Sequence, residues 1–205
     1  MTFHHYNEQD LAKDLRRLPE RLRTAFAAAT AVRLMPAYAG FSRKTGRGDP
    51  AKLAAIIERL WRDLEGDKMS ADQVRENIDL CTTLTPQEDE GPWVLEQAAA
   101  EDASAALAYA LRCRQSGDSQ EAAWAARRAY EAIDHFVIAQ EGIDTNRPGA
   151  EERVISHPLV QAELARQRRD LEELLSVSEA ATADLLTRLK HRASTEAESF
   201  FHVRQ

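Results

Sequence analysis

The chain has 205 residues, which is enough for one substantial hydrophobic core and short for two, so we expect a single domain over residues 1–205. It is 43% hydrophobic, 30% charged and only 6% aromatic, as is typical of a globular protein whose core is built from aliphatic residues and alanine. The net charge of −7 provides no broad cationic surface for a phosphate backbone or an anionic membrane, which argues against nucleic acid and membrane as partners.

Cysteine usage and the first residues favour a cytoplasmic location. Cys81 and Cys113 lie far apart without a C-x-x-C partner, a pattern better suited to free thiols than to a disulfide framework. The start of the chain lacks the basic and apolar pattern of a signal peptide. The longest strongly apolar run, residues 25–32, is far shorter than the ~20 residues that cross a bilayer.

The first part of the chain predicts a loose start followed by two helices. We expect residues 1–7 to be a tail, and an amphipathic helix is predicted from about residue 8 to 18. Pro19 then begins a second, long helix that reaches Lys44. Pro36 lies inside that helix and predicts a kink rather than an end, because its ring and its missing N–H disturb the preceding turn.

Large and small side chains follow Pro36 at helical spacing. Tyr38 and Phe41 present large apolar groups, whereas Gly40 leaves room for a neighbouring helix. We therefore expect the bent segment to be buried.

Four residues mark the end of the second helix and the start of the third. Gly46 and Gly48 supply the positive φ at which a helix stops, while Asp49 caps the next helix and Pro50 occupies its first turn. The third helix runs to about residue 65, with one buried stripe that includes Trp61.

The rest of the chain predicts more helices and no strand. A short helix follows Ser70, and an alanine-rich helical hairpin occupies residues 93–140. Residues 142–157 form a long connecting loop, and one long helix then runs from about residue 158 to 191. The predicted fold class is all-α: a single-domain bundle of about seven helices with a proline-kinked second helix and a long C-terminal helix.

The last helix carries charge pairs and ends in an apolar tail. Charge pairs at four-residue spacing are typical of an outer, solvated face. The pairs here are Arg166 with Asp170, Arg168 with Glu172 and Arg169 with Glu173. We expect residues 195–205 to be a loose tail. Its Phe200 and Phe201 either fold back onto the bundle or form an interface with another subunit.

Three motifs resemble one known family. They are Arg33-Leu34-Met35-Pro36-x-Tyr38-Ala39-x-Phe41, Thr45-Gly46-x-Gly48-Asp49 and Leu60-Trp61-x-x-Leu64. This stretch resembles the opening of the YjaG-like family, domain of unknown function 416, whose members are all-helical, bacterial and uncharacterised. The similarity continues to a helix start at His157-Pro158-x-Val160-x-x-Glu163. The resemblance implies a fold and assigns no catalytic or binding residue.

Candidate chemistry is sparse. Glu131, Asp134 and His135 would lie within one helical turn, with Glu141 nearby, and are the best metal constellation in the chain. Helical di-metal sites use a Glu-x-x-His pair from each of two helices, whereas here Glu131 and His135 are four apart and no second copy exists. A surface histidine is therefore the favoured interpretation. No nucleophile motif or phosphate loop is present, so we predict no catalytic residue and no cofactor.

Three functions follow as hypotheses. The first is a non-catalytic cytoplasmic module that acts through a protein partner or through self-association as a homodimer. The second is a helical metalloenzyme or small-ligand binder with a site near Glu131, Asp134 and His135. The third, suggested only by the acidic balance, is an inhibitor of a basic protein effector.

Overall fold

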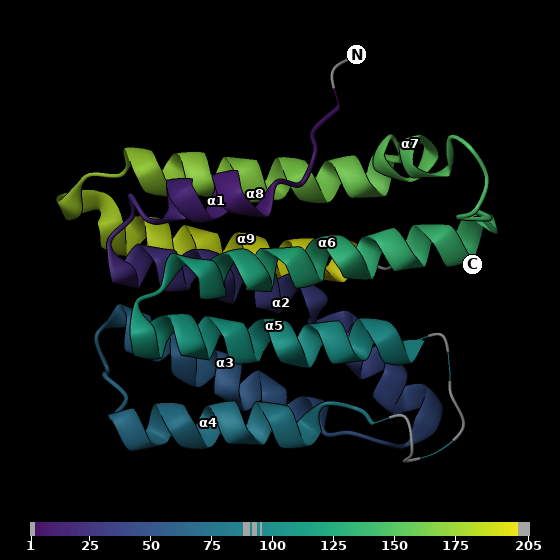
Figure 1. Ribbon diagram of the computed structural model, residues 1–205. Coiled ribbons are helices and arrows are strands. Elements are labelled where there is room, and N and C mark those ends of the chain that lie inside the picture. Colours follow the sequence, from purple (N-terminus) through teal and green to yellow (C-terminus); the bar gives the residue numbers. More distant parts are fainter. Residues whose placement is uncertain (1–2, 88–90, 92–93, 95, 201–205) are drawn as a thin grey trace.

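Helices account for the regular structure of the computed structural model, which describes residues 3–87, 91, 94 and 96–200 (Figure 1). This part of the chain holds nine α-helices and no strand, so the all-α prediction is confirmed and the predicted number of about seven helices is too low. The elements are α1 (Glu8–Leu15), α2 (Glu20–Thr45), α3 (Pro50–Glu65), α4 (Ala71–Leu84), α5 (Glu96–Ser116), α6 (Ser119–Glu141), α7 (Ala150–Ile155), α8 (Pro158–Ser176), the 3₁₀ helix η2 (Glu179–Ala181) and α9 (Thr182–Phe200).

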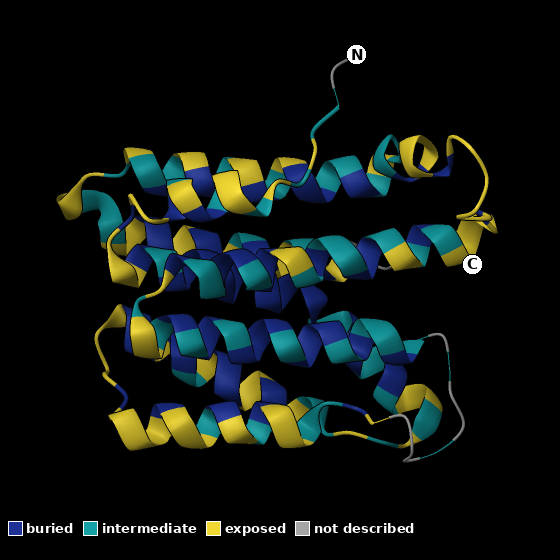
Figure 2. Cartoon of the chain, viewed as in Figure 1, coloured by how far each residue is buried: buried dark blue, intermediate teal, exposed yellow. Residues whose placement is uncertain are grey.

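Helix α2 is the centre of the bundle. It packs against α5, α9, α6 and α3, and every residue from Thr24 to Leu34 is buried (Figure 2). A helix that is buried on all sides needs small residues to let its neighbours approach, and the alanines of α2 supply them. The helix continues through Pro36 to Thr45 without ending there, as the sequence predicts. Within the described ranges, no helix is both long and apolar enough to span a bilayer.

The predicted long C-terminal helix is wrong, because the chain folds back after α8. Val177 and Ser178 are extended, with ψ angles of 137° and 156°, and α9 then runs back alongside α8 (Figure 1). Arg192 Nη2 donates to Asp170 Oδ1 at 2.8 Å and so joins the two arms of this hairpin. The turn contains neither glycine nor proline, which are the usual sequence signals for a helix end.

Segments that we expected to be irregular are more ordered. The connection over residues 142–157 contains α7, whose Ala150 and Val154 are buried. Helix α9 extends the helical structure to Phe200, well into the expected tail.

The segment before α1 is also held in place rather than loose. The Tyr6 hydroxyl donates to the Ala123 carbonyl at 2.8 Å, and the Tyr6 ring stacks on Tyr130 with 5.3 Å between centroids. The His4 N–H donates to Gln161 Oε1 at 2.9 Å.

A buried arginine, Arg33, ties α8 and α9 to α2. Its side chain is fully buried, and its Nη1 donates to Asp170 Oδ2 at 2.8 Å. Its Nε lies 3.5 Å from Glu163 Oε2, and Nη1 lies 3.6 Å from Glu196 Oε2. Asp170 therefore does not belong to the solvated outer face that we predicted for it, although Arg168 and Glu172 do form an exposed pair at 2.7 Å.

Burial and the arginines act in opposite directions on the two buried carboxyls of this cluster. Burial raises the pKa of Glu163 above its ordinary value, and the nearby Arg33 offsets only part of that rise. Burial also acts to raise the pKa of Asp170, but the attraction of Arg33 and the hydrogen bond from Arg169 leave that pKa below its ordinary value. Arg33 therefore favours the charged form of both carboxyls.

We predict that Arg33→Met destabilises the fold strongly, by about 3–5 kcal/mol, because it leaves Glu163 and Asp170 buried without their main partner. The free energy of unfolding in urea measures this loss. The matched control is Arg168→Met, which removes an arginine from an exposed pair whose side chains are 62% and 61% exposed and should cost less than about 1 kcal/mol. Equal losses in the two variants would contradict a stabilising role for the buried cluster.

Candidate functional site

The end of α2 and the start of α3 are shaped by backbone conformation. Gly46 has a φ of 71° and donates its N–H to the Ser42 carbonyl at 2.8 Å, which closes α2. Gly48 has a φ of 75°, and the Asp49 side chain accepts a hydrogen bond from the Lys52 N–H at 3.1 Å. Helix α3 therefore begins where the sequence predicts, with Pro50 in its first turn.

Tyr38, inside α2, connects the end of α4 to the start of α3. Its buried hydroxyl donates to the Leu84 carbonyl at the end of α4, at 2.6 Å, and accepts from the Asp49 N–H at 3.3 Å. A Cβ atom on Gly48 would lie 2.6 Å from this hydroxyl. Gly48 is thus required both by its positive φ and by the close approach of Tyr38.

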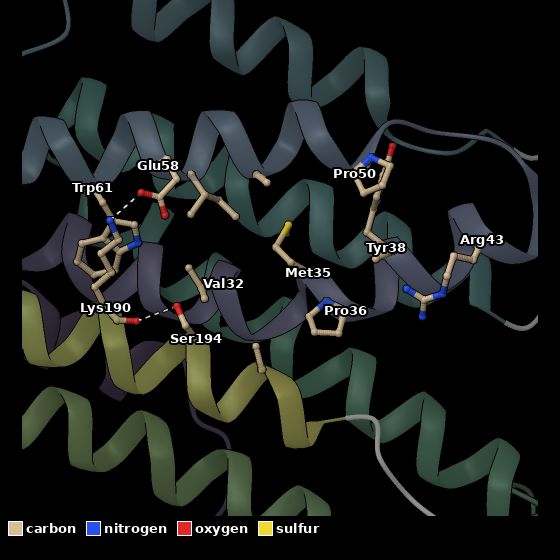
Figure 3. Close-up of a pocket in the computed structure, with 14 residues that line it drawn as sticks. Val32, Met35, Pro36, Tyr38, Arg43, Pro50, Glu58, Trp61, Lys190 and Ser194 are labelled. Atoms are coloured by element: carbon tan, nitrogen blue, oxygen red, sulfur yellow. Dashed lines mark hydrogen bonds and ion pairs between the residues drawn. The ribbon is translucent and has the colours of Figure 1, made fainter. Parts of the chain in front are cut away.

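Two grooves open on either side of the second half of α2. Groove A lies between α2, α3 and α9 and has a volume of about 490 Å³ (Figure 3). Groove A is lined by Val32, Met35, Pro36, Tyr38, Ala39, Arg43, Pro50, Ala54, Ile57, Glu58, Trp61, Lys190, Ser194 and Ala197. Lys190 Nζ donates to Glu58 Oε2 at 2.7 Å and joins α9 to α3 across one end of groove A, while Arg43 lies toward the other end.

Groove B lies between α2, α5 and α6 and has a volume of about 530 Å³. Groove B is lined by Pro36, Ala37, Gly40, Arg43, Glu96, Ala98, Ala99, Ala132, His135 and Phe136. Glu96 already accepts from Lys44 Nζ at 2.8 Å, and the hydrogen bond from Lys44 helps to hold the Glu96 pKa below its ordinary value although burial opposes this. The charge of Glu96 is therefore largely balanced within the chain.

The motif residues predicted from the sequence divide between these places. Pro36 borders both grooves, Tyr38, Pro50 and Trp61 border groove A, and Gly40 borders groove B. Phe41 is fully buried in the core. The bent segment is therefore not wholly enclosed, since Pro36 and Gly40 are only half-buried.

The interface predicted at Phe200 and Phe201 stays a prediction. Phe201 and the side chain of Phe200 lie outside the described residues.

The predicted metal residues of α6 are neighbours, but each has other contacts. Glu131 accepts from Arg127 Nε at 2.7 Å and from Arg128 Nη1 at 3.0 Å, whereas His135 is exposed and borders groove B. Burial raises the pKa of Asp134, and the neighbouring His135 together with a hydrogen bond from the Tyr130 hydroxyl offsets only part of that rise. Across the described residues, no three or more His, Cys, Asp or Glu side chains are grouped so as to hold a metal ion. The metal site stays a prediction.

Asp102 on α5 shares Arg128 with Glu131, and its pKa is unusually high. Its carboxylate accepts from Arg128 Nη1 at 3.2 Å, and its side chain is only 8% exposed. Burial raises the pKa of Asp102 from 3.8 to about 6, although Arg128 acts to lower it.

Comparison with known proteins decides the family. The model of a family described as "Protein of unknown function (DUF416)" matches residues 10–200. The chain belongs to this DUF416 family. The resemblance drawn from the sequence motifs is thereby confirmed.

A solved structure supports the fold of this DUF416 chain. The crystal structure of a DUF416 family protein from Shewanella baltica OS155 matches it with a TM-score of 0.76 and 22% sequence identity, over 89% of this chain and 92% of that chain. At this identity the likeness shows the fold alone. No curated protein matches the chain.

We predict that Gly48→Ala destabilises this DUF416 protein more than Gly46→Ala. Both variants place alanine at positive φ, which costs roughly 1–2 kcal/mol, but a methyl group on Gly46 meets nothing within 4 Å. The contact with Tyr38 should add about 1–3 kcal/mol at Gly48. Urea unfolding of both variants provides the comparison, and similar losses would show that Tyr38 does not constrain this position.

We predict a pH dependence that is carried by Asp102. The folded state binds the carboxyl proton of Asp102 more tightly than the unfolded chain does. Ionisation of Asp102 therefore lowers the free energy of unfolding, and this loss grows as the pH rises through about 4 to 6. Replacing Asp102 removes this pH-dependent loss. The free energy of unfolding of Asp102→Asn, relative to the wild type, should therefore rise by roughly 2 kcal/mol between about pH 4.5 and about pH 7. A pH-independent difference would contradict the raised pKa.

Proposed function

We propose that this protein is a non-catalytic interaction module of the cytoplasm, and that groove B receives an apolar segment of a partner protein that also carries an acidic side chain. The single observation that carries the proposal is groove B itself, which among the described residues is an open, mainly apolar groove bordered by Arg43. Apolar surfaces that stay open on a folded chain are typical of protein-binding sites.

The charge of Arg43 defines the partner. Arg43 is exposed at the border of groove B, and no carboxylate among the described residues forms an ion pair with it. The imidazole of His135 borders the same groove, whereas the charge of Glu96 is balanced by Lys44. An Asp or Glu next to apolar residues on the partner would complement this arrangement, since arginine pairs with carboxylates in a bidentate geometry.

Gly40 provides a second line of support. Glycine inside a helix costs about 1 kcal/mol relative to alanine. A Cβ atom on Gly40 would meet only the flexible end of Arg43, at 3.9 Å, so nothing within the described chain requires glycine there. Without a side chain at this position, the α2 backbone is open to close approach by a partner in groove B.

The two free cysteines support the proposed location. Cys81 and Cys113 are buried and unpaired, and burial raises the pKa of the Cys81 thiol to about 12 and that of Cys113 to about 11. Such protonated, inert thiols need no disulfide partner and suit a reducing compartment.

We predict that a photo-crosslinking residue at position 135 captures a partner protein in cells of the native host, and that the same residue at position 139 does not. His135 and Ala139 are both exposed on α6, but only His135 borders groove B. Mass spectrometry should map the adduct to a segment that combines apolar residues with Asp or Glu.

A matched pair of variants controls this experiment. Gly40→Leu fills groove B and should abolish the adduct, whereas Ala39→Leu, which faces groove A, should leave it intact. Equal capture at positions 135 and 139, insensitivity to Gly40→Leu, or an adduct between two copies of this chain would overturn the proposal.

A further inference from the structure

A buried hydrogen-bond donor that lacks an acceptor among the described residues lies beside one end of groove A. Trp61 is fully buried, and its indole Nε1 has no hydrogen-bond partner among the described residues. Trp61, Glu58 and Lys190 lie together at this end of the groove (Figure 3). A buried N–H that lacks an acceptor destabilises the protein. A ligand that brings an acceptor would therefore gain more binding free energy here than at a surface whose donors already have acceptors.

Lys190 supplies a charge beside this donor. Its Nζ binds Glu58 Oε2 at 2.7 Å, and the Glu58 side chain is 62% exposed and therefore well solvated. An ammonium group has three donors, so Lys190 retains donors for a second anionic group. The polar end of groove A therefore suits a carboxylate.

The stretch of groove A between Trp61 and the distant Arg43 is mainly apolar. From Trp61 it continues past Val32 and Met35 toward Pro36 (Figure 3), and Ile57 also lines it. The unbranched thioether of Met35 adapts to the shape of an aliphatic group. The volume of about 490 Å³ lies within the ~300–1,000 Å³ range of small-molecule sites.

The closed end favours a small molecule over a polypeptide. The Lys190–Glu58 ion pair joins α9 to α3, so a chain that ran the full length of the groove would have to displace it. A molecule with its acceptor at one terminus would instead end at that ion pair.

We propose that groove A binds a medium-chain aliphatic monocarboxylate. Its carboxylate accepts hydrogen bonds from Trp61 Nε1 and Lys190 Nζ, and its alkyl chain lies against Met35 and Ile57. This site is separate from the protein-binding role of groove B.

The test is isothermal titration calorimetry of the full chain with decanoate below its micelle concentration. Decanoate should bind, and decan-1-ol and decyltrimethylammonium should bind at least about tenfold more weakly, because they lack the charge that Lys190 recognises. Lys190→Met should weaken decanoate binding by about tenfold or more and leave decan-1-ol unchanged. The matched control Lys52→Met removes an exposed lysine outside the groove and should change neither.

A second pair of variants tests the place of binding. Ala54 and Ala55 are both exposed on α3, but only Ala54 borders groove A, so Ala54→Leu should abolish decanoate binding and Ala55→Leu should not. Benzothienylalanine at position 61, which replaces the indole N–H with sulfur, should weaken decanoate binding severalfold and confirm the role of the donor.

Three outcomes would overturn the inference. They are equal affinity for decanoate and decyltrimethylammonium, unchanged binding in Ala54→Leu, and unchanged binding in Lys190→Met. Each is independent of the crosslinking experiment at His135, which reports on groove B alone.

Discussion

The fully buried Arg33 determines how the bundle is assembled around α2. Its guanidinium holds Asp170 and Glu163 of α8, and Asp170 in turn accepts from Arg192 of α9. Alternate faces of α9 then have different roles, because Arg192 and Glu196 face this cluster while Lys190, Ser194 and Ala197 border groove A. The ionic cluster thus places one wall of a groove to which it does not itself contribute a side chain.

The two halves of α2 differ in how far they are buried. The first half is enclosed on all sides, and its alanines let α5, α6 and α9 approach closely. The second half begins near Pro36 and presents half-buried surface to grooves A and B. A single helix therefore joins the core to both candidate binding surfaces. Substitutions in its buried half should affect the grooves by shifting the second half of α2, because the buried residues do not themselves contact a bound molecule.

Local signals in the sequence are enough for the end of α2 and the start of α3, because Gly46 and Gly48 act through their own backbone and the Asp49 side chain caps the helix that follows it. They were not enough for Arg33, whose partner Asp170 is 137 positions away. The spacing of Arg166 and Asp170 fits an exposed pair equally well, and no periodicity reveals that the carboxylate turns inward. The turn at Val177 was missed because it carries no glycine or proline, and the grooves were missed because each needs three helices to form it.

The hydroxyl of Tyr38 has a consequence for binding kinetics. Because it accepts from the Asp49 N–H at the start of α3 and donates to the Leu84 carbonyl at the end of α4, it fixes both helix ends to α2 beside Tyr38, which borders groove A. An incoming molecule meets a preformed opening in which side-chain rotation, chiefly of the exposed Arg43, is the main adjustment. Association then proceeds without a slow backbone rearrangement, at a rate limited by diffusion and orientation.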